Sequence, residues 1–184
     1  DVGHAHQYVD FLERTFGTFA PRTVAMAYFE NHDSLRATKI WRERYQSLLA
    51  ENEPIEREWL ARVPDSPEKV MALLRNLQCS LIDATVGSAK SVNMAYAVEW
   101  GSEWGEEERT DFEHPTLLNP ALALEDPNQQ LARGYDMLRQ DVDRLDVLRD
   151  GHVYFYRNDD LGDSEDRVLA YMRYSSGAGV LVLH

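Results

Sequence analysis

The stretch from Thr23 to Asp33 reads TVAMAYFENHD, and the rest of the chain is best understood as support for it. Seven mostly apolar residues, Thr23 to Phe29, follow a proline and run directly into four polar residues, Glu30 to Asp33. A short apolar run of this kind is typical of a strand buried on both faces, as in a parallel sheet covered by helices. In barrels and open α/β sheets, ligands bind at the carboxyl ends of such strands. The sequence therefore predicts a site at Asn31, His32 and Asp33.

A second short apolar run, Val92 to Val98, ends shortly before Gly101-Ser102-Glu103-Trp104-Gly105. Helical sequence separates the two runs, an order that is typical of parallel strands joined through helices. We therefore expect the runs to pair in parallel, with Asp33 and Glu103 at the same edge. The two glycines suit a tight turn where the backbone comes close to another group.

Four stretches place apolar residues at helical intervals. They are Gln7 to Phe19, Ser34 to Leu48, Ser66 to Gly87 and Leu131 to Gly151. The first is expected to bury an aromatic stripe that includes Phe11, and the third a face that includes Leu74. Ser34 is predicted to cap the second helix. Arg36, near its start, is expected to pair with a carboxylate or to bond to the backbone.

From His152 onward the apolar period changes to two. Three stretches with this period are expected to form antiparallel strands, namely His152 to Tyr156, Val168 to Tyr174 and Val180 to Leu183. They indicate the start of a β domain.

Composition and charge exclude several classes of function. The chain has 184 residues, of which 43% are hydrophobic and 28% charged, a composition typical of a soluble globular protein. Its net charge of -13 opposes binding to nucleic acid, and no apolar run approaches the ~20 residues of a membrane helix. The carboxylates of Glu106 to Glu113 lack the ordered alternation of an EF-hand, so a solvated acidic loop is expected there. No metal or other cofactor is expected.

Three stretches resemble the α-amylase superfamily, glycoside hydrolase family 13. Phe29-Glu30-Asn31-His32-Asp33 is similar to the fourth conserved region of that family, which ends strand seven of a (β/α)8 barrel. Gly101 to Gly105 resembles its Gly-x-Glu-x-Gly at the end of strand eight, and Tyr135 to Gly151 resembles its last barrel helix. The resemblance covers most of the chain. The chain departs from the family between the two predicted strands. Its sequence there indicates at least two helices, where most members have one.

The resemblance implies a fold and an incomplete catalytic set. Residues 1–150 would be the C-terminal portion of a (β/α)8 TIM barrel, and residues 151–184 the start of an antiparallel β domain. The remainder of the barrel, with the nucleophile and the general acid, would come from the same longer chain. No signal peptide is visible at Asp1-Val2-Gly3, so a cytoplasmic location is expected, with the true N-terminus missing.

The implied activity is that of a retaining glycoside hydrolase or transglycosylase acting on α-linked glucans, and the residues do not decide between these two. Asp33 would be the third carboxylate, which stabilises the transition state, and His32 would bind the same sugar. Asn31 and Glu103 would complete the substrate site, Asn31 chiefly by fixing the turn. Trp104 would either stack on a sugar or cover the barrel rim, and Trp100 is expected to cover the rim.

A second interpretation needs no catalysis. The chain would then be a carbohydrate-binding or scaffolding α/β module, in which Asn31-His32-Asp33 merely caps the helix that begins at Ser34. Asp and Asn are common at such positions for structural reasons alone.

Overall fold

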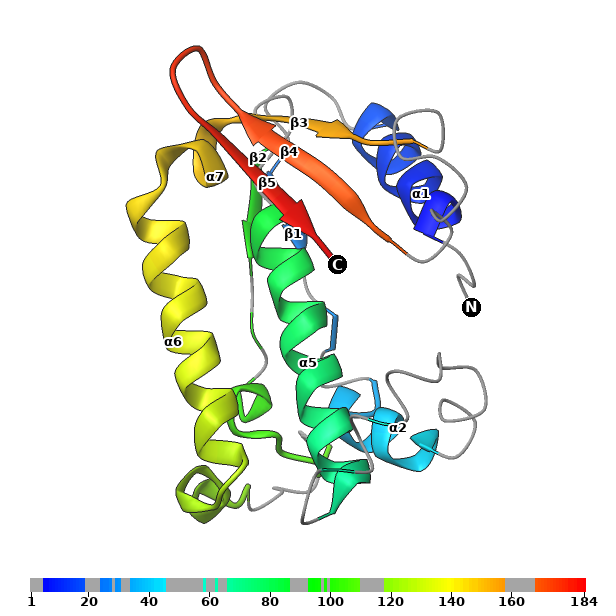
Figure 1. Cartoon of the computed structure of the whole chain (residues 1–184), viewed down its shortest axis with the longest axis vertical. Coiled ribbons are helices and arrows are strands. Elements are labelled where there is room, and N and C mark those ends of the chain that lie inside the picture. Colours follow the sequence, from blue (N-terminus) through cyan, green and yellow to red (C-terminus); the bar gives the residue numbers. More distant parts are fainter. Residues whose placement is uncertain are drawn as a thin grey trace. The chain divides into compact units, whose positions relative to one another are not determined.

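The computed structural model describes residues 5–18, 24–27, 29–30, 34–45, 58, 62, 66–86, 93–96, 98, 100–109, 118–157 and 168–184. It contains both helices and strands, so the expected α/β class is correct at this level (Figure 1). The helices are α1 (Ala5–Thr18), α2 (Ala37–Glu43), α5 (Pro67–Val86), α6 (Asn128–Arg144) and α7 (Asp146–Asp150), with the 3-10 helices η1 (Ser102–Trp104) and η2 (Pro120–Leu124). The strands are β1 (Val24–Ala27), β2 (Asn93–Tyr96), β3 (His152–Phe155), β4 (Ala170–Tyr174) and β5 (Gly179–Leu183).

The described residues belong to two compact units that interleave along the chain. The first unit comprises Asp1–Ala27, Ile82–Ala97 and Gln140–His184, and the second comprises Tyr28–Leu81 and Val98–Arg139. The expected boundary between a barrel and a β domain at residue 150 stays a prediction.

The first unit contains the expected parallel pair. β1 pairs with β2 in parallel, in a register that runs from Val24 opposite Asn93 to Ala27 opposite Tyr96. The prediction that these two apolar runs lie side by side in parallel is therefore confirmed. Parallel neighbours require a long crossover connection, and α2 and α5 lie between the two strands in the chain.

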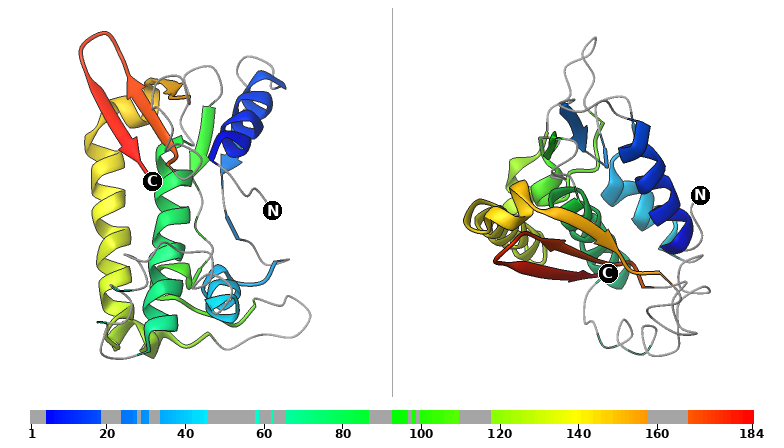
Figure 2. Two further views of the ribbon diagram at one scale, coloured as in Figure 1. Left: turned by 45° about the vertical axis from the view of Figure 1, so that its right-hand side comes forward. Right: turned by 90° about the horizontal axis from the view of Figure 1, so that it is seen from above.

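The same unit contains a three-stranded antiparallel sheet in the order β3-β4-β5 (Figure 2). The antiparallel strands expected from the period-two pattern are thus confirmed. Seven buried residues of α1, the end of α5 and the strand region form one apolar cluster, namely Val9, Leu12, Val86, Phe155, Leu169, Tyr171 and Val182. Phe11 was expected in this core and is 51% exposed. That prediction is wrong because α1 buries the face of Val9 and Leu12, and Phe11 stacks on Tyr8 instead.

A buried arginine closes the end of α5 within this unit. Arg173 of β4 is fully buried, and its Nη1 donates to the carbonyl oxygen of Thr85 at 2.6 Å. Its Nη2 donates to the carbonyl oxygen of Gly151 at 2.9 Å. The last carbonyls of a helix have no partner inside the helix, so the guanidinium both satisfies such an oxygen and places positive charge at the favourable end of the helix dipole.

The second unit has a smaller apolar cluster between α5 and α6. It consists of Leu73, Leu131 and Tyr135, with Leu77 packed against it. α5 begins at Pro67, as predicted, but Leu74 is 47% exposed. The prediction of a buried Leu74 is wrong because the helix turns Leu73 and Leu77 inward, which leaves Leu74 about 100° from Leu73 around the axis.

Two predicted helix boundaries are also wrong. The helix expected from Ser34 begins at Ala37, with Arg36 in an extended conformation at its N-cap. The helix expected to run as far as Gly151 divides into α6 and α7, because Leu145 between them has an extended backbone. Among the described helices, none is long and apolar enough to cross a membrane.

We predict that Asp83 makes the stability of the chain fall as pH rises. Asp83 lies in the part of α5 that belongs to the first unit, and burial raises its pKa from 3.8 to about 7. The folded state therefore holds a proton that the unfolded state has lost, so the contribution of Asp83 to stability is highest below about pH 4 and is lost as pH rises to about 7. Asp83→Asn should remove this loss, with a gain that grows over the same interval to at most about 4 kcal/mol.

The measurement is urea denaturation of the wild type and of Asp83→Asn between pH 5 and pH 8. His184, whose pKa burial lowers to about 4, is present in both proteins, so its contribution cancels. Asp136→Asn, at an exposed position on α6, is the matched control and should show no such trend. A gain that is the same at every pH would contradict the prediction.

Candidate functional site

The residues predicted to carry the chemistry lie only partly in the described chain. Asn31, His32 and Asp33 are outside the described residues, and so is the prediction that Asp33 shares an edge with Glu103. Glu30 on one side, Ser34 to Ala37 on the other, and the Gly101 to Gly105 turn are described. All of these belong to the second unit. Their contacts define the surroundings of the predicted site.

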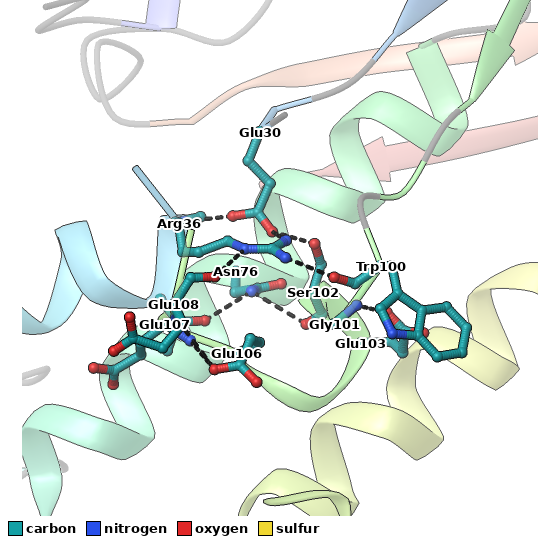
Figure 3. Close-up of polar contacts among 12 residues, drawn as sticks. Glu30, Arg36, Asn76, Trp100, Gly101, Ser102, Glu103, Glu106, Glu107 and Glu108 are labelled. Carbon is teal, nitrogen blue, oxygen red and sulfur yellow. Dashed lines mark hydrogen bonds and ion pairs between the residues drawn. The ribbon is translucent and has the colours of Figure 1, made fainter. Parts of the chain in front are cut away.

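A buried ion pair joins the two sides of the Asn-His-Asp segment. Nη1 of Arg36 lies 3.2 Å from Oε1 of Glu30, and both side chains are 1% exposed (Figure 3). The same Oε1 accepts a hydrogen bond from the hydroxyl of Ser102, and Oε2 accepts one from the backbone N–H of Ala37. The carboxylate is thus surrounded by donors, which is what a buried charge requires.

The guanidinium of Arg36 also holds the segment that follows β2. Its Nη2 donates to the carbonyl oxygen of Trp100 at 2.6 Å, and its Nε donates to that of Glu108 at 3.0 Å. Only arginine offers donors in a rigid planar fork of this kind. The sequence left open whether Arg36 pairs with a carboxylate or bonds to the backbone, and the structure has it doing both.

A second group of buried polar residues lies behind this pair. Nδ2 of Asn76 donates to Oγ1 of Thr38 at 2.9 Å and to the carbonyl oxygen of Ser102 at 3.3 Å. Oδ1 of Asn76 accepts from the hydroxyl of Tyr135 at 2.5 Å. Through Asn76, these bonds connect the helices α2, α5 and α6 to η1. All three helices therefore help to hold the Ser102 turn in place.

The glycines of the turn have a structural explanation. Gly101 and Gly105 flank η1 with φ values of 101° and 72°, in the left-handed region that side chains rarely adopt. A Cβ at Gly101 would lie 2.8 Å from Cβ of Glu106, and one at Gly105 would lie 2.4 Å from Cδ2 of Leu73. The groups that approach these glycines closely are therefore side chains of the protein itself.

Glu106 corrects the expectation of a solvated acidic loop. It is 3% exposed, and its carboxylate accepts from the backbone N–H groups of Glu107, Glu108 and Asn119 at 3.0, 3.2 and 2.6 Å. Three such bonds compensate the burial of the charge. Glu107 pairs with Arg42 at 2.5 Å. The described part of the chain contains no group of three or more potential metal ligands.

Glu103 and the two tryptophans lie together at the end of this turn. Oε2 of Glu103 accepts from the backbone N–H of Gly101 at 3.0 Å. Trp104 is 8% exposed, whereas Trp100 is 66% exposed, and their rings meet edge to face with centroids 5.2 Å apart. The ring with an open face is therefore that of Trp100, which was expected to cover a rim. Substrate contacts of Glu103 and Trp104 stay predictions.

Several residues of the network escaped the sequence analysis. Glu30 was recognised only as part of a polar cluster, and neither Ser102 nor Asn76 was singled out. One signal was present for Asn76, because it occupies a helical position between Leu73 and Ser80 on the buried face of α5. An amide within an otherwise buried stripe must find hydrogen-bond partners.

Comparison with known proteins does not assign this chain to a family. Neither a scan against models of protein families nor a search of curated proteins found a match. A proposal for its function therefore depends on its residues and on the contacts described above.

We predict strong coupling between Glu30 and Arg36. Either Glu30→Gln or Arg36→Met leaves one buried charge without its partner, which costs about 3–5 kcal/mol. The double variant leaves no such charge, so its loss of stability should be well below the sum of the two single losses. Urea denaturation of the four proteins measures the difference.

Asp136 and Arg139 on α6 offer a matched exposed pair, 2.7 Å apart. The same cycle there should give a coupling below about 1 kcal/mol, because water screens exposed charges. Additive losses at Glu30 and Arg36 would contradict the buried pairing.

Proposed function

We propose that this chain is the C-terminal part of a retaining α-amylase-type enzyme that acts on α-linked glucans. In this proposal β1 and β2 are the last two strands of a (β/α)8 barrel, and β3 to β5 begin an antiparallel β domain. The remainder of the barrel, with the nucleophile and the general acid, comes from the same longer chain. The proposal covers both hydrolysis by water and transfer to a second sugar.

One observation carries the proposal. The two stretches that resemble the family, Phe29 to Asp33 and Gly101 to Gly105, follow β1 and β2, which pair in parallel. Glu30 from the first stretch and Ser102 from the second are hydrogen-bonded to each other, and Arg36 binds both Glu30 and the carbonyl oxygen of Trp100. Residues after neighbouring parallel strands are where α/β proteins bind their ligands. The contacts thus support a common site for both stretches.

The proposed role of Asp33 is to stabilise the transition state. Glycoside hydrolysis with retention needs a nucleophilic carboxylate and an acid carboxylate, and positive charge develops on the sugar ring as the bond breaks. The hydrogen bonds between a third carboxylate and the sugar hydroxyls become stronger as that charge develops. They therefore lower the activation barrier. His32 binds the same sugar, and Asn31 fixes the turn.

The contacts of Glu30 favour this proposal over a purely structural role for the Asn-His-Asp segment. The structural alternative has these residues capping a helix that begins at Ser34. The helix begins at Ala37, and the N–H of Ala37 donates to the carboxylate of Glu30. Glu30 therefore already supplies the acidic acceptor that a helix start favours.

We predict that Asp33→Asn in the naturally expressed protein lowers kcat for α-linked glucans by orders of magnitude and changes KM only a few-fold. The reason is that removal of an interaction made in the transition state lowers kcat and kcat/KM together. Initial rates with a soluble α-glucan measure this effect. The melting temperature should stay unchanged, because Asn is close to Asp in size and in capping ability.

Asp136→Asn on the exposed face of α6 is the control and should keep full turnover. If Asp33→Asn turned over substrate like the wild type at an unchanged melting temperature, the assignment of Asp33 would fail. The non-catalytic module would then be the better interpretation.

We also predict that the 184-residue chain by itself releases no reducing sugar from starch. The third carboxylate cannot by itself supply covalent or acid catalysis. The assay is release of reducing ends by the purified chain over several hours, with a blank lacking protein. Release that depends on the chain would contradict the proposed division of the catalytic set.

A further inference from the structure

Trp100 is exposed and yet held firmly. Its carbonyl oxygen accepts the 2.6 Å hydrogen bond from the buried guanidinium of Arg36, and its ring meets that of Trp104 edge to face. Trp104 is itself buried, and Asn128 donates to its carbonyl oxygen at 2.8 Å. In Figure 3 the indole of Trp100 points away from Glu30, Arg36 and Asn76. An aromatic face that is fixed before binding costs little entropy when a ligand covers it.

A carboxylate with spare bonding capacity is fixed to the backbone next to Trp100 in the chain. Oε2 of Glu103 accepts from the N–H of Gly101, so the carboxylate is fixed next to the peptide bond that joins Trp100 to Gly101. Oε1 of Glu103 accepts no hydrogen bond from the described residues, and the side chain is partly open to solvent. An ionised carboxylate has about four acceptor positions. Glu103 can therefore bind a ligand and keep the turn intact.

We infer that Trp100 and Glu103 form a subsite for one pyranose ring of an α-glucan. The apolar C–H face of the sugar stacks on the indole of Trp100, and a hydroxyl at the edge of the same sugar donates to Oε1 of Glu103. This inference rests on the proposed function and adds a binding residue, Trp100, that the resemblance to the α-amylase superfamily did not supply.

The chemistry of the pair favours a neutral sugar over a charged ligand. An anion would meet the carboxylate of Glu103 in a chain of net charge -13. Capture of an organic cation uses a cage of several aromatic faces. Of the two tryptophans that the structure describes at this turn, only Trp100 is exposed, because Trp104 is buried. A pyranose has one apolar face and a rim of hydroxyl groups, which matches one ring and one acceptor.

The test is the binding of maltopentaose to the protein in its natural length with the substitution Asp33→Asn. This variant is used so that the sugar is bound and not consumed. Isothermal titration calorimetry gives Kd. Trp100→Ala and Trp100→Leu should each weaken binding about tenfold, since both remove the aromatic face. The Leu variant still covers Trp104, which keeps the fold intact if the Ala variant is unstable. Trp100→Tyr should bind within about threefold of the parent, because a tyrosine ring also stacks on sugars.

Glu103→Gln keeps an acceptor for the N–H of Gly101 and loses the charge, so it should weaken binding by a smaller factor than Trp100→Leu. Leu124→Ala removes an exposed apolar side chain of η2 and is the control, with no change in Kd expected. Tetramethylammonium, tested with the same proteins, should not bind.

The outcomes separate the two proposals. Turnover of α-glucan that Asp33→Asn abolishes, together with maltopentaose binding that Trp100→Leu leaves unchanged, would overturn the subsite and leave the proposed function standing. Binding of tetramethylammonium that depends on Trp100, with no maltopentaose binding, would overturn the subsite in favour of a cation site. A protein that neither binds nor turns over α-glucans would overturn both proposals.

Discussion

The buried ion pair of Glu30 and Arg36 is the interaction on which the second unit depends. Its two residues lie six positions apart, on either side of the Asn-His-Asp segment, and both side chains are almost completely excluded from water. A buried pair often contributes little net stability, because desolvation of the two charges offsets their attraction. What it does provide is a fixed geometry, since separating the two side chains would leave each buried charge without its oppositely charged partner. The ends of the predicted catalytic segment are held in this way.

The partners of Arg36 extend that constraint beyond its own segment. Its hydrogen bonds to the carbonyl oxygens of Trp100 and Glu108 fix the backbone on both sides of η1. Arg173 in the first unit acts by the same chemistry, because its guanidinium also binds carbonyl oxygens of elements remote in sequence. In both cases one planar, permanently charged group organises backbone that no regular hydrogen-bond ladder reaches.

The two tryptophans of the turn have different roles. Trp104 is buried, and its backbone is bonded to Asn128 on α6, so it supports the turn. Trp100 has its backbone fixed by Arg36 and its ring open to solvent. The network that holds the turn therefore also orients an aromatic surface. The proposed glucan subsite makes use of this combination of rigidity and exposure.

The sequence by itself determined which stretches form helices and strands, though not every helix boundary, because local periodicity encodes the type of element. The order of these elements along the chain indicated how the strands pair. The apolar runs at Thr23 and Val92, the start of α5 at Pro67 and the period of two after His152 were each sufficient to predict parallel strands, a helix and an antiparallel sheet. Only the tertiary structure decided which polar groups are buried together. Glu106 is indistinguishable in sequence from its acidic neighbours, and three backbone N–H groups from two segments select it for burial. Such a choice depends on donors brought together by folding, which no local pattern encodes.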